Sequence, residues 1–428
     1  TTLISVNFIY SCIVIVFNEI NIIMVNQYYC NAPFEHIYVE ERELRPCCWW
    51  KPTDDISTTD FTTGTVGDGV KNMRVMFEHP KINAIRKRMT TGQELTDNCI
   101  QCKTHEALGG RSHRHNHNDK ARAVYSYSET HGIYPKPEIK TMELNLGNLC
   151  NLACVMCGSH NSTKWYEDDV KLYGMKKGQL RTSFGDKFVK SDAVEHALNI
   201  DDLDWDLLKN VTGIKLAGGE NLMMPQHTKL LETLIEKDLA KNIGLLYVVN
   251  ATHDPLEHHP NWKKFRKIHI IISIDGIGDV AEYIRYHTVW KEVDENIQKY
   301  FNLVKEHENY IISTNTTVSL LNVTHLVDIY DYWNFQYIKH LQRTPVESEQ
   351  NMYRLLSSPD HLHIKHIPDE FRKDIINKLD TVKELQHISQ ELRADNETNK
   401  WSKSIKWIEK LDNIRGNNFY DVNPQFKS

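Results

Sequence analysis

Nine cysteines in two tight groups constrain this chain more than any other feature. They are Cys12, Cys30, Cys47, Cys48, Cys99, Cys102, Cys150, Cys154 and Cys157. An odd count with short paired spacings does not resemble a disulfide framework, and in a long chain of intracellular type it indicates metal or cluster ligands. The chain has 428 residues, and the rest of its composition is ordinary, with 25% charged residues, 40% hydrophobic residues and a net charge of −6. They exclude a disordered chain, a multi-span membrane protein and a nucleic-acid binder that works by bulk positive charge.

The first residues, 1–23, are predicted to be a non-structural extension or translated upstream sequence. The apolar run 8–17 is shorter than the roughly 20 residues that span a bilayer. A secretory signal needs an early positive charge, and no Lys or Arg precedes Arg42. The alternatives are a buried helix or strand, or a membrane anchor. Without a targeting segment we expect a cytoplasmic protein with no membrane partner.

From about residue 138, short strand-like runs alternate with helical runs. The predicted strands are 141–146, 213–217, 243–250, 268–274, 310–318 and 336–341. Helices are predicted between them, for example at 227–239 and 293–306. Six strands, each followed by a helix, predict an α/β fold built on a parallel barrel or open sheet. The active site of such a fold lies at the carboxyl ends of the strands.

Outside this region the pattern is simpler. A short helix is predicted at 81–89, and the polar, histidine-rich stretch 109–120 is predicted to be a linker, with a metal-binding tract as the alternative. Apolar residues repeat at helical spacing over 371–385 and 401–414, which predicts two closing helices that pack on the barrel.

The second cysteine group directly follows the first predicted strand of the repeat. In GNLCNLACVMC, Cys150, Cys154 and Cys157 form C-x3-C-x2-C. An iron–sulfur cubane takes four ligands, so three thiolates on one loop would leave the fourth iron open to a substrate or cofactor. Zinc usually takes four protein ligands in two pairs and fits this spacing less well. Coincidental spacing or a zinc loop is the alternative.

This motif resembles that of the radical S-adenosylmethionine (SAM) superfamily. The resemblance implies a partial (β/α)6 TIM-like barrel and a [4Fe–4S] cluster whose open iron is chelated by SAM. It also implies an enzyme that uses an electron from a flavodoxin- or ferredoxin-type partner to cleave SAM to methionine and a 5′-deoxyadenosyl radical, which abstracts hydrogen. The superfamily commonly has an aromatic residue before the last cysteine, and Met156 is a mild departure.

A glycine-rich segment after the second strand adds to the resemblance. Gly218-Gly219-Glu220 resembles the superfamily's Gly-Gly-Glu motif, which meets the amino group of SAM. Glycine lets backbone approach a ligand closely, and a carboxylate can accept hydrogen bonds from an ammonium group. Pro225 is predicted to open the next helix, and the long interval after the cysteines predicts an insertion around 168–204.

Two later strands end in further candidate SAM contacts. Asn250 stands at a position that resembles a contact to the SAM ribose. The segment with Ser273, Asp275 and the later Arg285 resembles the Ser-x-Asp-Gly segment of related enzymes. The resemblance implies that Ser273 and Arg285 of this chain hold the SAM carboxylate or orient the substrate. An arginine fork suits a carboxylate. The alternative at Arg285 is a structural ion pair.

The first cysteine group resembles a twitch domain, the shortened relative of the SPASM domain, which carries an auxiliary [4Fe–4S] cluster. The implied ligands are Cys30, Cys47, Cys99 and Cys102. Neighbouring side chains in extended chain point to opposite sides, so we expect Cys48 to be a packing residue. Arg42 replaces a glycine of the pattern. A structural zinc ribbon is the alternative.

The order of the domains indicates which radical SAM proteins this chain resembles most. A twitch domain ahead of the barrel resembles a family of radical SAM proteins, common in phage and marine bacterial sequences, without an assigned reaction. The shared features include Cys99-x2-Cys102-x3-Glu106. The predicted domains are the extension 1–23, a twitch-like domain 24–120, the barrel 138–345 and a helical region 346–428.

The predicted activity is radical SAM chemistry on a peptide or protein substrate, by analogy with twitch and SPASM relatives. Oxidation of a small molecule by the same chemistry is one alternative. A non-catalytic zinc- or cluster-binding module that recognises RNA or protein is another, although no stripe of basic and aromatic residues supports it, and we expect no nucleic-acid partner.

Overall fold

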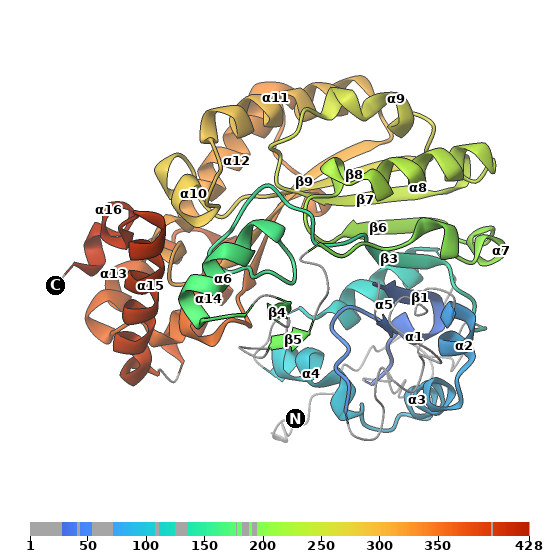
Figure 1. Cartoon of the computed structure of the whole chain (residues 1–428), viewed down its shortest axis with the longest axis horizontal. Helices are drawn as coiled ribbons and strands as arrows, with labels where there is room; N and C mark the ends of the chain where they lie inside the picture. Colours follow the sequence, from blue (N-terminus) through green and yellow to red (C-terminus); the bar gives the residue numbers. More distant parts are fainter. Residues whose placement is uncertain are drawn as a thin grey trace, which may run out of the picture. The chain divides into compact units, whose positions relative to one another are not determined.

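The computed structural model describes residues 28–40, 43–53, 72–107, 111–124, 136–176, 178–181, 188–190, 195–394 and 397–427. Residues 1–23 and Cys12 lie outside the described residues. The chain divides into two compact units (Figure 1): unit 1 takes the described part of Thr1–Glu143 with Asp204–Asn210, and unit 2 takes that of Leu144–Leu203 with Val211–Ser428. Within the described ranges, no helix has both the length and the apolar character that crossing a bilayer requires.

Unit 1 is built from short elements. They are α1 (Ala32–Glu35), β1 (His36–Val39), β2 (Leu44–Arg45), α2 (Met73–Glu78), α3 (Pro80–Thr90), α4 (Ile100–Ala107), α5 (His113–Val124) and α7 (Trp205–Leu208). The strands β1 and β2 pair antiparallel, with Tyr38 opposite Arg45. The helix predicted at 81–89 is confirmed as α3, which begins with Pro80 at its first position and buries Ile82 and Ile85.

The prediction of a linker at 109–120 is wrong, because its described part from His113 onward is helix α5. The residues after the glycine pair contain neither Gly nor Pro, so nothing in them interrupts a helix. Polar side chains of this segment are buried with partners: Asn118 Nδ2 donates to Tyr29 O at 2.9 Å, and Ser112 Oγ donates to Glu106 Oε1 at 2.5 Å. Polar side chains of this segment therefore form hydrogen bonds inside unit 1 instead of facing solvent as those of a linker would.

Unit 2 is an α/β unit. Within it, the strands of the main sheet lie in the order β10-β9-β8-β7-β6-β3, and β4 and β5 form a separate two-stranded sheet. Its strands are β3 (Thr141–Asn145), whose first three residues belong to unit 1, β4 (Gln179–Arg181), β5 (Phe188–Lys190), β6 (Gly213–Ala217), β7 (Gly244–Val249), β8 (Lys267–Ser273), β9 (Tyr310–Val318) and β10 (Asn351–Leu355). Neighbours from β6 to β10 pair in parallel. The predicted α/β class is thus confirmed, while closure into a barrel stays a prediction.

The helices of unit 2 alternate with these strands and then gather at the end of the chain (Figure 1). They are α6 (Tyr166–Tyr173), α8 (Pro225–Glu236), α9 (His259–Trp262), α10 (Asp279–Ile284), α11 (Trp290–Glu306), α12 (Leu326–Leu341), α13 (Asp369–Leu379), α14 (Gln386–Arg393), α15 (Trp401–Arg415) and α16 (Phe419–Val422). Pro225 opens α8 as predicted. The predicted insertion contains α6 and the antiparallel pair β4–β5.

Aliphatic strands form the core of unit 2. In β8, Ile268, Ile270, Ile271 and Ile272 are all buried, so side chains on both faces of the strand are covered. This is the pattern of a central parallel strand between helical layers. Five of the six predicted strands are observed within one or two residues of their predicted bounds.

The sixth strand, predicted at 336–341, is wrong, because these residues form the last turns of α12. Trp333 and Tyr337 are buried while Phe335 and Ile338 are exposed, which is a helical periodicity. The strand β10 lies further along, at Asn351–Leu355.

The closing helices were predicted in part. Helix α15 matches the run 401–414, but the helix predicted over 371–385 ends at Leu379. Val382 and Leu385 are buried from a separate short turn that leads into α14. The helical spacing of apolar residues therefore continues past Leu379, although the helix itself ends there.

Candidate active site

The cysteine loop of unit 2 follows β3 and is held by hydrogen bonds to its own carbonyl groups. Cys157 N donates to Cys154 O at 2.8 Å, and Trp165 Nε1 donates to the same oxygen at 2.7 Å. Arg181 Nη2 donates to Cys157 O at 2.6 Å. These donors fix the backbone that carries Cys150, Cys154 and Cys157.

The environment of the three sulfurs suits thiolate ligands once their protons are lost. Burial raises the pKa of all three thiols, that of Cys150 to about 12. Leu152 N donates to Cys150 Sγ at 3.5 Å, and the N–H of Gly158 lowers the pKa of Cys157. Backbone N–H groups directed at sulfur stabilise the charged ligand form. Three thiols on one fixed loop therefore fit an iron–sulfur cluster with one iron left open.

The two glycines of the Gly-Gly-Glu segment lie against the cysteine loop. Gly219 N donates to Gly147 O, and Glu220 N donates to Leu149 O, both at 2.8 Å. A Cβ at Gly219 would lie 2.2 Å from Leu149 O. Gly218 has a φ of +119°, and a Cβ there would lie 2.5 Å from Gly147 O. Both positions therefore need glycine for contact between β6 and the loop, before any ligand is considered.

Glu220 is buried and bridges the ends of two adjacent strands. Its Oε1 accepts from Leu222 N at 3.3 Å, and its Oε2 accepts from Asn250 N at 2.7 Å. Burial raises the pKa of Glu220 to about 7, against the effect of these N–H donors and of Arg285. A carboxylate has about four acceptor sites, so two remain for an ammonium group.

The side chain of Asn250 is directed at the cysteine loop. Its Nδ2 donates to Asn151 Oδ1 at 2.9 Å, and Thr252 donates to its Oδ1 from both N and Oγ1, at 2.9 and 2.7 Å. Asn151 Nδ2 in turn donates to Thr252 Oγ1 at 2.8 Å. The amide predicted to contact the SAM ribose thus also orients the loop residue next to Cys150.

Arg285 forms an ion pair with the buried Asp275, with Arg285 Nε 3.0 Å from Asp275 Oδ2. Asp275 Oδ1 accepts from Thr317 N at 2.8 Å. Although burial lowers it, the pKa of Arg285 is raised overall, because Asp275 and the sulfurs of Cys154 and Cys150 act on it. The structural ion pair considered for Arg285 is present, and the guanidinium also lies within electrostatic reach of the cysteines.

The backbone around Arg285 places it there. Val155 N donates to Ile284 O at 2.8 Å, and Ala153 N donates to Tyr286 O at 3.0 Å. The segment that ends α10 is therefore hydrogen-bonded to the cysteine loop on both sides of Arg285. Ser273 is the last residue of β8, in register with Asn315 of β9.

Sequence reasoning missed the residues that hold the loop, Trp165 and Arg181, and Arg181 makes the most contacts. Besides its bond to the carbonyl of Cys157, its Nε lies 3.1 Å from Oδ1 of the buried Asp169. Its guanidinium also fills the space where a Cβ at Gly158 would lie. Arg181 comes from the insertion, in which no motif was recognised, so only the fold could bring it to the loop.

The four predicted auxiliary ligands lie together in unit 1. One pocket is lined by Cys30, Cys47, Cys99 and Cys102 with residues of α5. Burial raises the pKa of Cys99 to about 12 and also raises that of Cys47 well above its usual value, and Cys48, Cys30 and the other two cysteines add to the effect on Cys47. The Sγ of Cys48 lies 3.7 Å from His113 Nδ1. Four thiols around one pocket form a donor set that fits a cubane.

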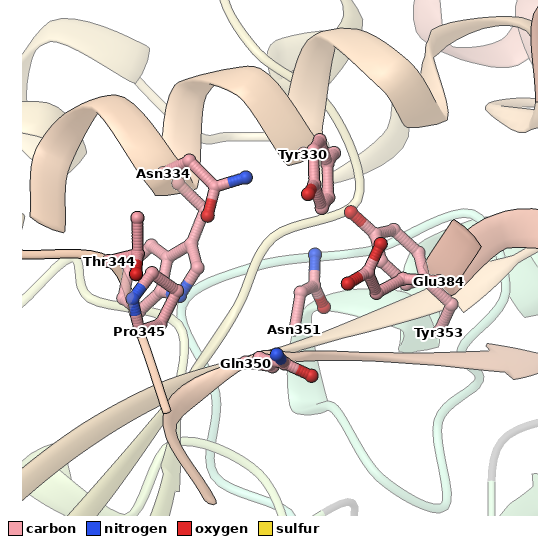
Figure 2. Close-up of a pocket in the computed structure, with 9 residues that line it drawn as sticks. Tyr330, Asn334, Thr344, Pro345, Gln350, Asn351, Tyr353 and Glu384 are labelled. Carbon is pink, nitrogen blue, oxygen red and sulfur yellow. The ribbon is translucent and has the colours of Figure 1, made fainter. Parts of the chain in front are cut away.

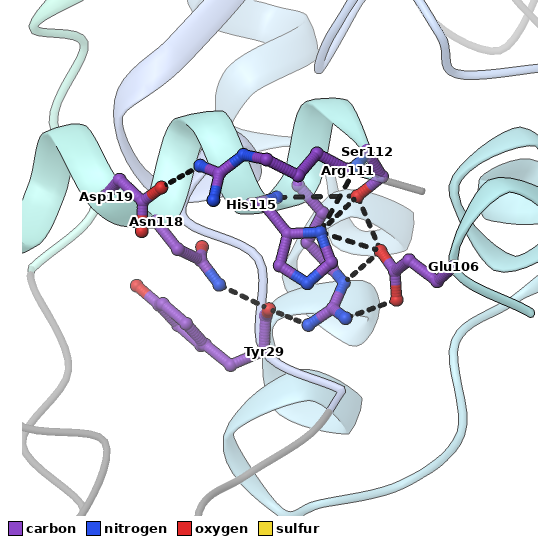
Figure 3. Close-up of polar contacts among 8 residues, drawn as sticks. Tyr29, Glu106, Arg111, Ser112, His115, Asn118 and Asp119 are labelled. Carbon is purple, nitrogen blue, oxygen red and sulfur yellow. Dashed lines mark hydrogen bonds and ion pairs between the residues drawn. The ribbon is translucent and has the colours of Figure 1, made fainter. Parts of the chain in front are cut away.

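Glu106, the last residue of the Cys-x2-Cys-x3-Glu match, holds Arg114, whose charge acts on these cysteines. Figure 3 shows Glu106 with its other polar partners, Ser112 and His115. Arg114 Nε donates to Glu106 Oε1 at 2.9 Å, Arg114 Nη2 pairs with Oε2, and Arg114 Nη1 donates to Tyr29 O at 3.0 Å. The positive charge of Arg114 lowers the pKa of Cys30, and its backbone N–H lowers that of Cys102, both against burial.

A separate pocket of about 380 Å³ lies between α12 and the edge strand β10 (Figure 2). Its lining combines aromatic rings, carboxamides and one carboxylate: Tyr330, Trp333, Asn334, Thr344, Pro345, Gln350, Asn351, Tyr353 and Glu384. It shares no residue with the cysteine loop.

Comparison with known proteins gives weak structural likenesses. No family model and no curated protein sequence matches the chain. Among solved structures, "Native anSMEcpe with bound AdoMet and Cp18Cys peptide" is 16% identical, with a TM-score of 0.32, over 57% of this chain and 60% of that one. "Crystal structure of Streptococcus suis SuiB bound to precursor peptide SuiA" is 12% identical, with a TM-score of 0.35, over 79% of this chain and 66% of that one. The chain thus spans less than two thirds of either structure.

Proposed function

We propose that this chain is a radical SAM enzyme in which Cys150, Cys154 and Cys157 hold a [4Fe–4S] cluster. The observation that supports it is the hydrogen-bonded frame around the cysteine loop. The Gly-Gly-Glu segment bonds to the loop on one side, and the segment carrying Arg285 bonds to it on another. Motif residues that are far apart in sequence thus surround one set of three thiols at the carboxyl ends of adjacent strands, where α/β folds bind their ligands.

When bound, the cluster supplies the electron that cleaves SAM to methionine and a 5′-deoxyadenosyl radical. The chain's own residues would bind and orient SAM around it. Glu220 has acceptor sites left for the ammonium group, and Arg285, held by Asp275, offers its remaining N–H groups to the carboxylate. Ser273 and Asn250 stand at neighbouring strand ends.

We extend the proposal to an auxiliary [4Fe–4S] cluster held by Cys30, Cys47, Cys99 and Cys102 in a twitch-like domain over 24–120. With all four positions taken, it would transfer electrons and would not bind substrate. The barrel would begin near residue 138 and extend past its predicted end at 345 to include β10 (Asn351–Leu355), which pairs with β9, and the helical region would follow it to 428. A peptide or protein substrate and a flavodoxin- or ferredoxin-type reductant follow from the motif resemblance alone.

The test is SAM cleavage by anaerobically reconstituted, chemically reduced protein, with 5′-deoxyadenosine measured by chromatography. We expect slow cleavage without substrate. Cys154→Ala should abolish it, because two thiolates cannot hold a cluster with one open iron. Cys48→Ala is the matched control and should cleave SAM at the native rate. Native-rate cleavage by Cys154→Ala would refute the proposal, and a colourless protein with zinc at both cysteine groups would identify a zinc-binding module instead.

A further inference from the structure

A buried histidine in the carboxyl-terminal part of unit 2 faces two carboxylates. Potential ligand atoms of Asp360, His366 and Glu397 all lie within 4.8 Å of one another, and in the described part of the chain no other three such residues are this close. His366 is 1% exposed, whereas the carboxylates reach solvent. His366 Nε2 lies 3.8 Å from Asp360 Oδ1, too far for a hydrogen bond.

The other ring nitrogen of His366 bonds to a hydroxyl group that permits the Nδ1–H tautomer. His366 Nδ1 lies 2.9 Å from Ser404 Oγ on α15, and Ser404 Oγ donates its own proton to Lys400 O at 3.3 Å. With its proton on Lys400 O, the hydroxyl oxygen accepts from Nδ1–H, and in that tautomer the lone pair is on Nε2. Nε2 has no hydrogen-bond partner in the structure. A ligating histidine is oriented in this way by a bond to its second nitrogen.

An acceptor nitrogen and two carboxylates thus lie close together, an arrangement that one cation can satisfy. The ammonium group of Lys400 lies at its edge, 3.1 Å from Asp360 Oδ2 and paired with Glu397. It neutralises the carboxylates but leaves Nε2 without a partner. Because Lys400 is on a flexible stem and 38% exposed, it can turn to solvent when another cation enters.

We propose that Asp360, His366 and Glu397 bind one divalent cation of the Mn²⁺, Fe²⁺ or Zn²⁺ kind. One imidazole and two carboxylates are the donors such ions prefer, and metal–ligand bonds of about 2.1 Å accommodate a ligand separation of 3.8 Å. The ion would join the turns η12 (Asp360–Leu362) and η13 (Ile364–His366) to η15 (Thr398–Lys400), which leads into α15. The site is independent of both cysteine groups.

Mn²⁺ is the probe of choice, because it favours oxygen and nitrogen donors over the thiolates of the cysteine groups. The full chain is titrated with Mn²⁺ and the free ion is followed by electron paramagnetic resonance. We expect one site per chain. Asp360→Asn, at an exposed position, should weaken binding at least about tenfold. Lys400→Met should tighten it, because it removes the competing ammonium group. Asp369→Asn, an exposed carboxylate at the start of α13, is the matched control and should bind like the wild type.

Histidine ligation has its own signature. Pulsed resonance of bound Mn²⁺ should show coupling to a ¹⁴N nucleus, and His366→Gln should remove it. The proposal is overturned if the wild type binds no Mn²⁺ stoichiometrically, if Asp360→Asn binds as tightly as Asp369→Asn, or if nitrogen coupling persists in His366→Gln. Because the readout is metal binding, none of these outcomes depends on SAM chemistry.

Discussion

Replacing Gly219 by alanine tests whether the Gly-Gly-Glu segment shapes the cysteine loop directly. The added Cβ would lie 2.2 Å from Leu149 O and 2.9 Å from Asn148 C. Both atoms are backbone and cannot rotate away. The end of β6 and the loop would have to separate by about 0.8 Å to reach 3.0 Å, the practical lower limit for a Cβ contact.

The expected magnitude follows from the contacts that this separation disturbs. The bonds from Gly219 N to Gly147 O and from Glu220 N to Leu149 O are both 2.8 Å long and would stretch together. A hydrogen bond contributes about 1 kcal/mol net, and overpacking a rigid site costs roughly 1–3 kcal/mol. We expect Gly219→Ala to lower the free energy of unfolding of unit 2 by about 2–4 kcal/mol on these values.

Two measurements check this prediction, urea unfolding and iron content after anaerobic reconstitution. The matched control is Gly244→Ala at the start of β7, where a Cβ would make an ordinary contact of 3.5 Å with Lys267 Cβ. The control should retain native iron and nearly native stability. If Gly219→Ala unfolds at the same urea concentration as Gly244→Ala and binds the same iron, the close-approach argument is wrong.

Three further predictions concern other parts of the chain. With two cubanes per chain, iron should be about eight, stay near eight in Cys48→Ala and fall to about four in Cys99→Ala; retention of both clusters in Cys99→Ala would contradict the ligand assignment. Arg114→Met should make the midpoint potential of the proposed auxiliary cluster more negative, because it removes a positive charge beside the sulfurs, whereas Arg111→Met, whose arginine pairs with Asp119 on the surface, should leave it unchanged. Burial lowers the pKa of His227 to about 3, so its stabilising effect is complete above about pH 6.5 and is lost as the pH falls toward 3. At pH 5.5 the loss is about 1.4 kcal/mol relative to pH 7.5, and His227→Gln should show a correspondingly smaller pH dependence of urea unfolding.

The sequence predicted most of what local patterns control. Strands such as β8 are aliphatic on both faces, and this composition marks a buried parallel strand without knowledge of its neighbours. The prediction failed where residues 336–341 continued a helix, because a stretch of six residues with only Tyr337, Ile338 and Leu341 apolar is too short to distinguish a strand from the end of a helix. It failed at the linker predicted over 109–120, whose described part from His113 onward is helical, because a polar helix shows no amphipathic period when its polar groups bond inside the unit.

The candidate site was predictable in its motifs but not in its supporting residues. Arg181 and Trp165 hold the cysteine loop through backbone carbonyl groups, and any residue can supply a carbonyl. The sequence around the cysteines therefore does not indicate that Arg181 and Trp165 bond to this loop. For Glu106 the motif spacing predicts the residue but not its role. The structure shows that Glu106 holds Arg114 by accepting a hydrogen bond from its side chain.

The motif residues contact one another before they contact any ligand, and this affects how their mutants should be read. Glu220 uses both carboxylate oxygens on backbone N–H groups, Asn250 orients Asn151 of the loop, and Asp275 pairs with Arg285. Loss of activity on substitution would therefore follow equally from a misplaced loop or from a missing SAM contact. The two causes separate by metal content, because a misplaced loop loses iron and a missing contact does not. A site framed in this way presents its three thiols in fixed positions, which is the preorganisation that a cluster with one open iron requires.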